Sequence, residues 1–354
     1  MSEPAQEPRF GPIRTNPPRG VVDGVGAAPG ATWSSSRLGG ESGYPNGGMW
    51  RFSSSEDESA SVVVKRTGPR HLGTDHVWRG AVDPADPQWW GREATFYLSR
   101  LAVDGWDQGC RAARCLDVDD HDGARDLWLE DVAGIPLPRS EYEAAVTGLA
   151  RWQVHHRSTK ESWLSAGWIP THLHRRRLDN DHTVAHPAWS RLIDLGVAAS
   201  ARGAVRDRVT DRAVAAKVLD RLPQLLTHYD FHNMNLGQVD GQVVIIDWST
   251  VGWGPVGHDV GFLLIDQASD LGGGAAEVWD DLARTYATAL RAAGCEYSTT
   301  DICRSVAISN VLRQSWIVDL LLTNSAAMQD QEIVAVAPVI NLLASFQATY
   351  VSEI

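Results

Sequence analysis

The segment from residue 227 to residue 259 constrains the chain more than any other, because it sets two carboxylates and an amide at fixed intervals. Asp230 lies two residues after His228, and Asn235 lies five residues after Asp230. Asp247 ends an apolar run, twelve residues beyond Asn235. This order supplies one carboxylate that can take a proton, an amide that can hold a metal, and a second carboxylate for the metal.

The spacing between Asn235 and Asp247 predicts a hairpin. Gly237 to Gly241 is expected to form the turn, and Val243 to Ile246 is expected to form the apolar return strand. Because a hairpin brings its two ends together, Asn235 and Asp247 are expected to face one ion. The alternative is a polar hairpin whose Asp and Asn side chains only cap turns.

Phosphoryl transfer from a nucleotide requires these groups close together. A base orients the attacking hydroxyl, and Mg²⁺ neutralises the charge that develops on the transferred group. Asp230, Asn235 and Asp247 are therefore the candidate catalytic residues, and Asn235 and Asp247 are the candidate metal ligands. A metal hydrolase built on His228, Asp230 and His232 is a further alternative, but it has no complete ligand set.

The same residues carry a resemblance to a known family. The segment resembles the catalytic and metal-binding loops of the aminoglycoside phosphotransferase family, the small-molecule relatives of protein kinases. The family motif reads His-Gly-Asp-x4-Asn, and its metal aspartate lies in Ile-Asp-Trp or Ile-Asp-Phe, as in Ile246-Asp247-Trp248 here. Tyr229 stands where the family usually has Gly. The role of Asp259 implied by the resemblance is to brace the catalytic loop, whereas its position alone is explained by helix capping.

The resemblance implies an α+β, protein-kinase-like fold with two lobes. Residues 1–32, rich in Pro, Gly and Ala, are expected to be a flexible N-terminal arm that can lie partly on the first lobe. Residues 33–131 are expected to form a small, β-rich, nucleotide-binding N-lobe. Residues 132–354 are expected to form a larger, mainly helical C-lobe that carries catalysis and acceptor binding. Helices are expected at 141–156, 187–202, 209–221, 275–293, 300–322 and 331–350, with another that opens near residue 257.

Several residues of the N-lobe are candidates for nucleotide binding. Lys65 ends a β-branched strand, in a chain that has only three lysines, and Glu93 lies in the first turn of an amphipathic helix. The family pairs such a lysine with such a glutamate, although a surface lysine and a helix-dipole role explain each residue alone. The remaining candidates are Ser42 and Gly43 of a Gly-rich turn, which a plain hairpin also explains, and Glu130 and Val132 of the hinge.

The implied activity is transfer of the γ-phosphate of ATP or GTP to a hydroxyl of a small molecule, with Mg²⁺ as cofactor. Asp266 and Asp270 lie four residues apart on one helical face and are, with Asp230 and Trp253, the candidate acceptor-binding residues. Trp163, Trp168 and Trp316 offer further flat walls. These features favour an antibiotic of aminoglycoside or sugar-nucleoside type, and hence a resistance factor. The alternatives are a metabolite kinase acting on choline, homoserine or a sugar, and a kinase-like binding module without turnover.

Charge and cysteine content restrict the partners and the compartment. The net charge of −12 argues against a nucleic-acid surface and fits a cationic or neutral small molecule. The four cysteines show no zinc spacing, the N-terminus has no apolar signal core, and no run approaches the length of a membrane span. A cytoplasmic monomer or homodimer without membrane or nucleic-acid partners is expected.

Overall fold

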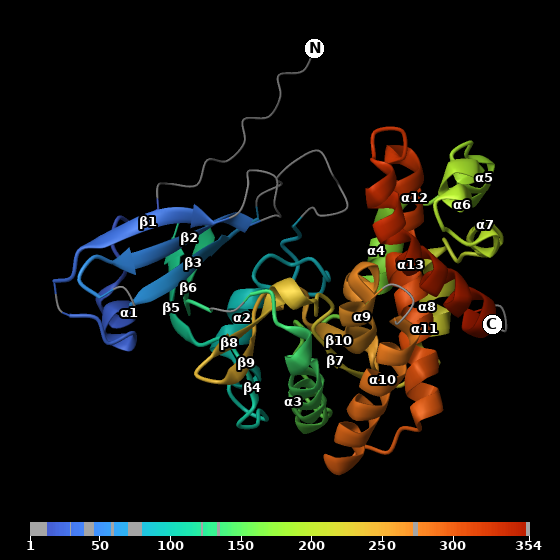
Figure 1. Cartoon of the computed structure of the whole chain (residues 1–354). Helices are drawn as coiled ribbons and strands as arrows, with labels where there is room; N and C mark the ends of the chain where they lie inside the picture. The colour runs from blue at the N-terminus through green and yellow to red at the C-terminus, as the bar shows by residue number, and fades with distance from the viewer. Residues whose placement is uncertain are drawn as a thin grey trace.

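The computed structural model describes residues 13–28, 30–38, 46–57, 60–69, 80–121, 123–132, 135–271 and 275–351. The backbone forms an α+β fold in which a β-sheet lobe and a larger helical lobe lie side by side (Figure 1). The two-lobed arrangement expected from the sequence is therefore confirmed. The Gly-rich turn at Ser42 and Gly43 lies outside the described residues.

The N-lobe is built on a five-stranded antiparallel sheet. Its strands follow the order β1-β2-β3-β6-β5. Their bounds are β1 Trp33–Leu38, β2 Asn46–Ser54, β3 Ser61–Thr67, β5 Cys115–His121 and β6 Ala124–Glu130. Helix α2, Arg92–Leu98, carries Glu93 in its first turn, as expected from the sequence. It lies between this sheet and the C-lobe (Figure 1). The strand predicted around Lys65 is confirmed as β3 and continues for two residues beyond the lysine.

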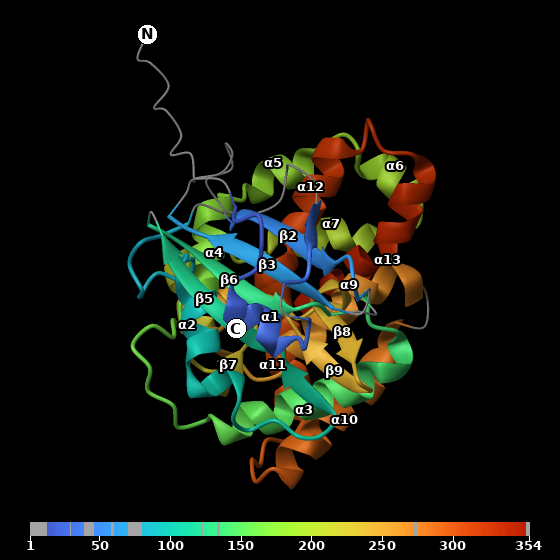
Figure 2. The same cartoon turned by 90° about the vertical axis from the view of Figure 1, so that its left-hand side faces the viewer.

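One helix of the N-terminal arm packs against the N-lobe sheet. Helix α1, Arg19–Gly24, contacts strand β5, and Figure 2 shows it in front of the sheet. Val21 is fully buried in a cluster with Phe52, Val62, Val64 and Trp128. Part of the N-terminal arm therefore lies on the N-lobe, where Val21 fills the apolar face of the sheet.

Two small sheets connect the lobes and carry the catalytic segment. In the first, β4 Cys110–Ala112 pairs parallel with β9 Gln242–Ile245, which pairs antiparallel with β8 Leu236–Val239. In the second, β10 Gly252–Pro255 pairs with β7 Gln224–Thr227. The predicted hairpin is confirmed, but its turn is narrower than expected. Gly237 lies within β8, and the turn consists of Asp240 and Gly241, which both have positive φ.

The C-lobe is helical around one large core. Its central helices are α3 Tyr142–His155, α4 Trp168–Arg176, α8 Arg212–Leu219, α9 His258–Leu271, α10 Ala275–Ala292 and α11 Thr299–Gln314. The main apolar cluster contains residues of all six helices and also Phe96 of α2 and Leu127 of β6. The two lobes therefore share one core.

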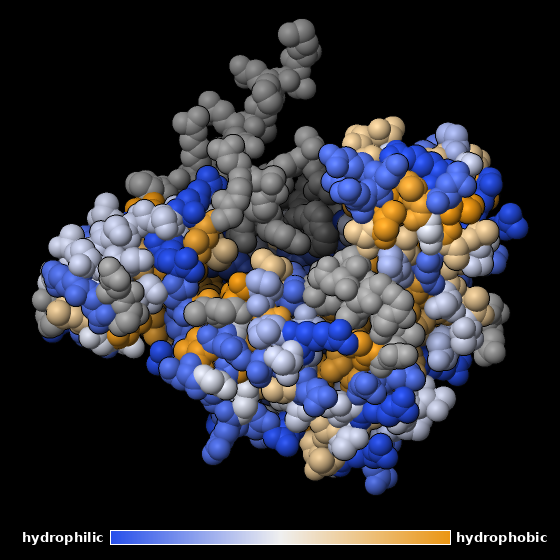
Figure 3. Space-filling view, in the orientation of Figure 1, coloured by the Kyte–Doolittle hydropathy of each residue, from blue (hydrophilic) through white to orange (hydrophobic). Residues whose placement is uncertain are grey.

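A side bundle projects from the C-lobe with a core of its own. It consists of α5 Asn180–Ala185, α6 Trp189–Asp194, α7 Ala199–Arg206, α12 Trp316–Asn324 and α13 Asp330–Phe346. Trp189, Leu192 and Ile333 are among the buried residues of this second cluster. In Figure 3 hydrophobic residues gather among hydrophilic ones on the visible face of this projection. Leu320 of α12 is 47% exposed.

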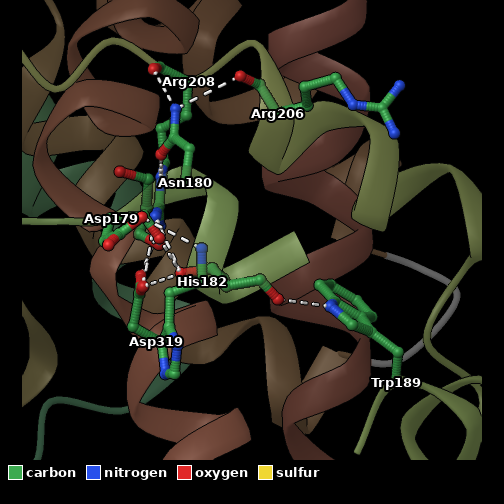
Figure 4. A network of polar contacts seen from close by, with 9 residues as sticks. Asp179, Asn180, His182, Trp189, Arg206, Arg208 and Asp319 are labelled. Atoms are coloured by element: carbon green, nitrogen blue, oxygen red, sulfur yellow. Dashed lines mark hydrogen bonds and ion pairs between the residues drawn. The ribbon is translucent and has the colours of Figure 1, made fainter. Parts of the chain in front are cut away.

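Polar contacts join the parts of the side bundle (Figure 4). The buried guanidinium of Arg208 forms an ion pair with Asp319 of α12 and donates from Nε to the Asn180 Oδ1 atom at 2.9 Å. The Asn180 amide donates to the backbone oxygen of Arg208 at 2.8 Å, and Trp189 Nε1 donates to Thr183 O at 2.8 Å. These contacts fix α5 between the loop after α7 and helix α12.

Two helices expected to be continuous are interrupted. The segment 187–202 is divided into α6 and α7 at Gly196, whose φ of 103° is unsuited to a helix. The segment 300–322 is divided into α11 and α12 at Ser315. Both breaks let short helices turn around the side bundle rather than continue along the lobe.

Helix α13 corrects one expectation about membrane spans. Within the described ranges, Asp330–Tyr350 is long and apolar enough to cross a membrane by length and composition alone. Its Ile333 and Ile340 side chains are buried in the core of the side bundle, and Leu343 is buried in the main core. Apolar residues on several sides of one helix produce this pattern when the helix packs between two cores.

Candidate active site

The catalytic loop after β7 is held by a buried carboxylate. Asp259, in the first turn of α9, is 1% exposed. Its two carboxylate oxygens accept the backbone N–H groups of His228 and Tyr229, each at 2.9 Å. Burial raises the pKa of Asp259 to about 7, and the two N–H donors oppose that shift. The bracing role implied by the sequence motif is therefore confirmed.

His228 connects the catalytic loop to the strand that ends at Asp247. Its Nε2 atom lies 2.9 Å from the Ile246 carbonyl oxygen, and its Nδ1 atom accepts the Asp230 N–H at 3.2 Å. This pair of partners requires the neutral ring with its proton on Nε2. Burial lowers the pKa of His228 to about 4, so the ring stays neutral near pH 7. Because both ring nitrogens have partners, His228 cannot serve the hydrolase site considered above.

Asp230 and Asn235 form one polar unit beside the hairpin. The Asn235 amide nitrogen lies 2.9 Å from Asp230 Oδ2 and 2.9 Å from the Asp230 backbone oxygen. The Ile246 N–H donates to the Asn235 carbonyl at 3.0 Å, which sets Asn235 beside the end of β9 and next to Asp247. Since the amide nitrogen faces Asp230, the amide oxygen is the atom left for a metal.

Asp247 has the chemistry of a metal ligand. It stands at φ 60°, in the left-handed region, between β9 and a short 3-10 helix at Trp248–Thr250. Burial would raise the pKa of Asp247, but the Lys65 ammonium lowers it below its usual range. Its side chain is 29% exposed, so an ionised oxygen ligand is reachable from solvent. Together with the Asn235 oxygen it fits Mg²⁺, which prefers such hard oxygen donors.

Lys65 is shared by two carboxylates. Its Nζ atom lies 2.7 Å from Glu93 Oε2 and 2.8 Å from Asp247 Oδ1. The Lys65 and Glu93 side chains are 6% and 0% exposed, which excludes the surface role considered from sequence. Burial lowers the pKa of Lys65, but Asp247 and Glu93 outweigh burial and raise it above its ordinary value. The predicted pairing of Lys65 with Glu93 is confirmed.

Helix α2 is fixed against the metal-binding strand by aromatic packing. Phe96 of α2 stacks on Trp248 with ring centroids 4.2 Å apart and planes 9° from parallel. Trp248 is fully buried and also packs against Trp152 of α3 at 5.0 Å. The helix that carries Glu93 and the residue after Asp247 therefore form one packed unit.

At the hinge, the backbone N–H and the carboxylate of Glu130 both have partners within the protein. Its N–H donates to the Arg114 carbonyl at 3.0 Å, so that group is not available to a nucleotide base. Its carboxylate forms ion pairs with Arg111 and, at 3.0 Å, with Arg114. Glu130 thus joins β6 to the segment after β4. Val132 follows at the end of the described hinge and is 7% exposed.

The loop accommodates Tyr229 at the position where the motif usually has Gly. Its φ is 68°, in the left-handed region that glycine adopts freely. The side chain is 1% exposed, its ring stacks on Trp168 at 5.4 Å, and its hydroxyl donates to the Trp253 carbonyl at 2.7 Å. Neighbouring Gly254 leaves room for it, since a Cβ there would lie 2.5 Å from the hydroxyl.

The tryptophans expected to line the acceptor pocket do not share one role. Trp163 and Trp168 are 7% and 2% exposed and belong to the main core. Trp316 is covered by the Arg176 guanidinium, 4.0 Å from the ring centroid, and Trp253 is partly exposed beside Tyr229. The expectation of open walls is wrong for Trp163 and Trp168, because burial of their large rings dominates.

His232 is predicted from the sequence only within the hydrolase alternative, and Phe262 and Arg313 are not predicted at all. His232 Nε2 lies 3.6 Å from Asp230 Oδ2, and the ring of His232 lies 5.7 Å from that of Phe262 on α9. Arg313 of α11 lies over both Phe262, at 5.5 Å, and Trp168, at 4.2 Å. The motif indicates His232, whereas Phe262 meets His232 through tertiary packing, and Arg313 in turn contacts Phe262.

The structure describes the backbone of the two candidate aspartates of α9. Asp266 and Asp270 lie within His258–Leu271, on the helix that begins with the loop-bracing Asp259. Their spacing therefore does fall on one helix, as predicted. Their side chains are outside the described part of the structure.

The two-lobed kinase-like fold, in which Lys65 pairs with Glu93 and Asp247 and Asn235 pairs with Asp230, defines a phosphotransferase of the small-molecule kinase class. The chain belongs to the phosphotransferase enzyme family, whose model matches residues 87–297. A comparison with curated protein sequences found no match.

Solved structures of similar fold include several kinases. A choline kinase from Cryptosporidium parvum Iowa II superposes with a TM-score of 0.50 at 12% identity, covering 91% of this chain and 90% of that chain. Amicoumacin kinase hAmiN, in complex with AMP-PNP, Ca²⁺ and Ami, gives 0.49 at 13% identity, covering 90% and 88%. A choline/ethanolamine kinase family protein from Mesorhizobium loti gives 0.47 at 16%, covering 93% and 98%. Identities this low relate the fold alone.

Proposed function

We propose that the protein transfers the γ-phosphate of ATP or GTP to a hydroxyl of a small molecule, with Mg²⁺ as the metal. The observation that carries this proposal is the shared position of Lys65 between Glu93 and Asp247, at 2.7 and 2.8 Å. It joins the N-lobe strand, the N-lobe helix and the C-lobe metal strand in one charged cluster. Asp230 in the same catalytic segment argues against a binding module without turnover, because binding alone needs no base.

Each residue has a separate task in the proposed reaction. Asp230 accepts the proton of the attacking hydroxyl and orients it, while Asn235 fixes the Asp230 carboxylate through its amide nitrogen at 2.9 Å. Asn235 and Asp247 would hold the metal with oxygen atoms. When bound, Mg²⁺ neutralises charge on the transferred phosphoryl group. Lys65 contacts the nucleotide phosphates and remains anchored by Glu93, whose carboxylate is buried.

For the acceptor we propose an antibiotic of aminoglycoside or sugar-nucleoside type. Support comes from Asp266 and Asp270 on α9, from the partly exposed Trp253, and from the net charge of −12. Carboxylates attract a cationic acceptor, and a flat ring packs against a sugar. Phosphorylation would add charge and bulk to a hydroxyl that the drug needs, and so would give resistance. We also propose that the enzyme is a cytoplasmic monomer or homodimer without nucleic-acid or membrane partners.

A phosphate-transfer screen tests the proposal. Purified protein is incubated with Mg²⁺, ATP or GTP, and panels of antibiotics, choline, homoserine and sugars, and phosphorylated products are detected by mass spectrometry. Asp230→Asn protein provides the matched control, because it keeps the shape of the side chain. Expression in a sensitive bacterium then measures inhibitory concentrations. If the protein rapidly phosphorylates a primary metabolite and protects against no antibiotic, the acceptor is that metabolite and the antibiotic proposal is wrong.

A further inference from the structure

The side chain of Tyr229 is anchored more firmly than its place in a loop requires. Its ring lies between the indole of Trp168, stacked at 5.4 Å with planes 19° apart, and the imidazole of His258 at 5.2 Å. Its hydroxyl donates to the Trp253 carbonyl at 2.7 Å. The residue next to the catalytic carboxylate therefore contacts helix α4, helix α9 and strand β10 at once.

The backbone of Tyr229 needs these anchors. A left-handed φ of 68° costs free energy in any residue with a Cβ, because Cβ approaches the carbonyl oxygen. A glycine would adopt this conformation without cost but would also leave it readily. The tyrosine can stay there only because its ring and hydroxyl contacts offset the strain, and the same contacts oppose every other conformation.

The anchors of Tyr229 lead to a second segment of the chain, which precedes helix α4. Trp253 donates its N–H to the Ser165 carbonyl at 2.9 Å, and Gly252 packs so closely on that carbonyl that a Cβ would lie 2.3 Å away. Tyr229 is therefore the link between the catalytic loop and the segment 163–168 that leads into α4. Gly254 is required for this link, because a Cβ there would meet the tyrosine hydroxyl.

We propose that Tyr229 is a positioning residue, which aims the Asp230 carboxylate by locking the loop backbone onto β10 and α4. This inference rests on the proposed function, because it assigns the loop to phosphoryl transfer. Tyr229 does not contact the reacting atoms, since its side chain is buried and its hydroxyl is bound by Trp253. It acts through the direction of the next residue along the chain.

Three variants separate positioning from simple packing. Tyr229→Phe keeps the ring and removes the hydroxyl bond, whereas Tyr229→Gly removes all side-chain anchors but tolerates the positive φ. Gly254→Ala leaves Tyr229 unchanged but crowds its hydroxyl, at 2.5 Å from the added Cβ, and also the Thr227 hydroxyl at 2.7 Å. Trp189→Phe is the control, because it removes one buried hydrogen bond in the distant side bundle.

Two measurements are made on the full-length protein. Hydrogen exchange monitored by mass spectrometry follows the amides of residues 228–235, and kcat and KM are measured with Mg·ATP, using water and the acceptor found by the screen. We expect faster exchange confined to residues 228–235 in Tyr229→Gly and kcat lower by about tenfold or more, since small misplacements of a reacting group cost up to about 100-fold. The KM for ATP is expected to stay within about twofold. Tyr229→Phe and Gly254→Ala should show the same pattern more weakly, and Trp189→Phe should not show it.

If Tyr229→Gly exchanges its amides and turns over at the wild-type rates, the positioning role is overturned. Glycine would then hold the loop as well as tyrosine does. A fall in kcat matched by an equal rise in the KM for ATP would also overturn it. If Tyr229→Gly does not fold, Tyr229→Phe and Gly254→Ala decide by the same criteria. A wild-type protein that transfers phosphate to no acceptor would contradict the proposed function, whereas the exchange data report on the loop independently.

Discussion

At the scale of single residues, Asp230 carries the most direct prediction. Its carboxylate accepts a hydrogen bond from Asn235 and is 18% exposed, so an acceptor hydroxyl can reach it. Replacing it by Asn keeps the size of the side chain and removes the base. We expect Asp230→Asn to lower kcat by about 10²- to 10⁴-fold, the usual contribution of a positioned base. Nucleotide binding measured by calorimetry should be unchanged, and near-wild-type turnover would exclude Asp230 from the mechanism.

Lys65 and Glu93 are expected to behave as one unit. Lys65→Met should raise the KM for the nucleotide, because the cation near the phosphates is lost, and Glu93→Gln should do so less strongly. Since the two side chains are buried and in contact at 2.7 Å, the double variant should be little worse than Lys65→Met alone. Steady-state kinetics of the four proteins measures the coupling. Fully additive losses would mean that the pair does not act together on the nucleotide.

His228 predicts a pH dependence of stability. Its pKa is about 4 in the folded state and near 6.5 when unfolded, so the unfolded chain binds the proton more tightly between these values. The stability that neutral His228 contributes is complete above about pH 6.5 and is lost as the pH falls towards 4. Integrated over that window, the loss is about 3 kcal/mol.

Urea denaturation of wild type and His228→Gln at pH 7 and pH 4.5 tests this dependence. Glutamine does not titrate, so the stability difference between the two proteins should shrink at pH 4.5. The opposing effect of Asp259, whose pKa is raised to about 7, is present in both proteins and cancels in the comparison. An equal difference at the two pH values would contradict the assignment of a neutral, buried His228.

At the scale of elements, the structure shows which features sequence patterns can predict. The Lys65 strand, the Glu93 helix and the hairpin up to Asp247 all combine a local periodicity with a motif, and all three are confirmed. The sequence predicts a turn that begins too early, because glycine at position 237 is typical of a turn residue. In the structure its φ is not positive, and it pairs with Val244 within the ladder.

Other elements depend on contacts between distant parts of the chain. Arg313 meets Trp168 only because α11 packs against α4, and Val21 is buried only because the sheet needs a cover on its outer face. Composition marked the Val21 region as a Pro- and Gly-rich arm. Neither contact leaves a periodic signal near the residue itself, which is why local reasoning could not predict them.

Helix α1 gives a prediction about the N-terminal arm. Val21→Ala removes two methyl groups from a fully buried site against Phe52 and Trp128, and should lower the free energy of unfolding by about 2 kcal/mol. The same substitution at the adjacent Val22, which lies outside that cluster, is the control and should cost less. Chemical denaturation measures both. Equal, small effects would mean that α1 does not contribute to the N-lobe core.

At the scale of the whole molecule, the main core determines how the lobes respond to ligands. Phe96 of the N-lobe helix stacks on Trp248 at 4.2 Å, and Trp248 continues through Trp152 into the C-lobe. A helix held this way cannot swing away from the cleft without opening the core. Changes on nucleotide binding are therefore expected to come from side chains such as Lys65, which can exchange Asp247 for a phosphate.

A shared core also predicts cooperative unfolding. Because residues from α2 and β6 pack in the same cluster as α3 and α11, both lobes should unfold in one calorimetric transition. Mg·AMP-PNP at about 100 times its Kd should shift that single transition upward, as expected for a stabilisation of about 2.7 kcal/mol. Trp248→Ala, which removes the stack between the lobes, should separate the transition into two. Two transitions in the wild-type protein, with only one shifted by the nucleotide, would show that the lobes are energetically independent.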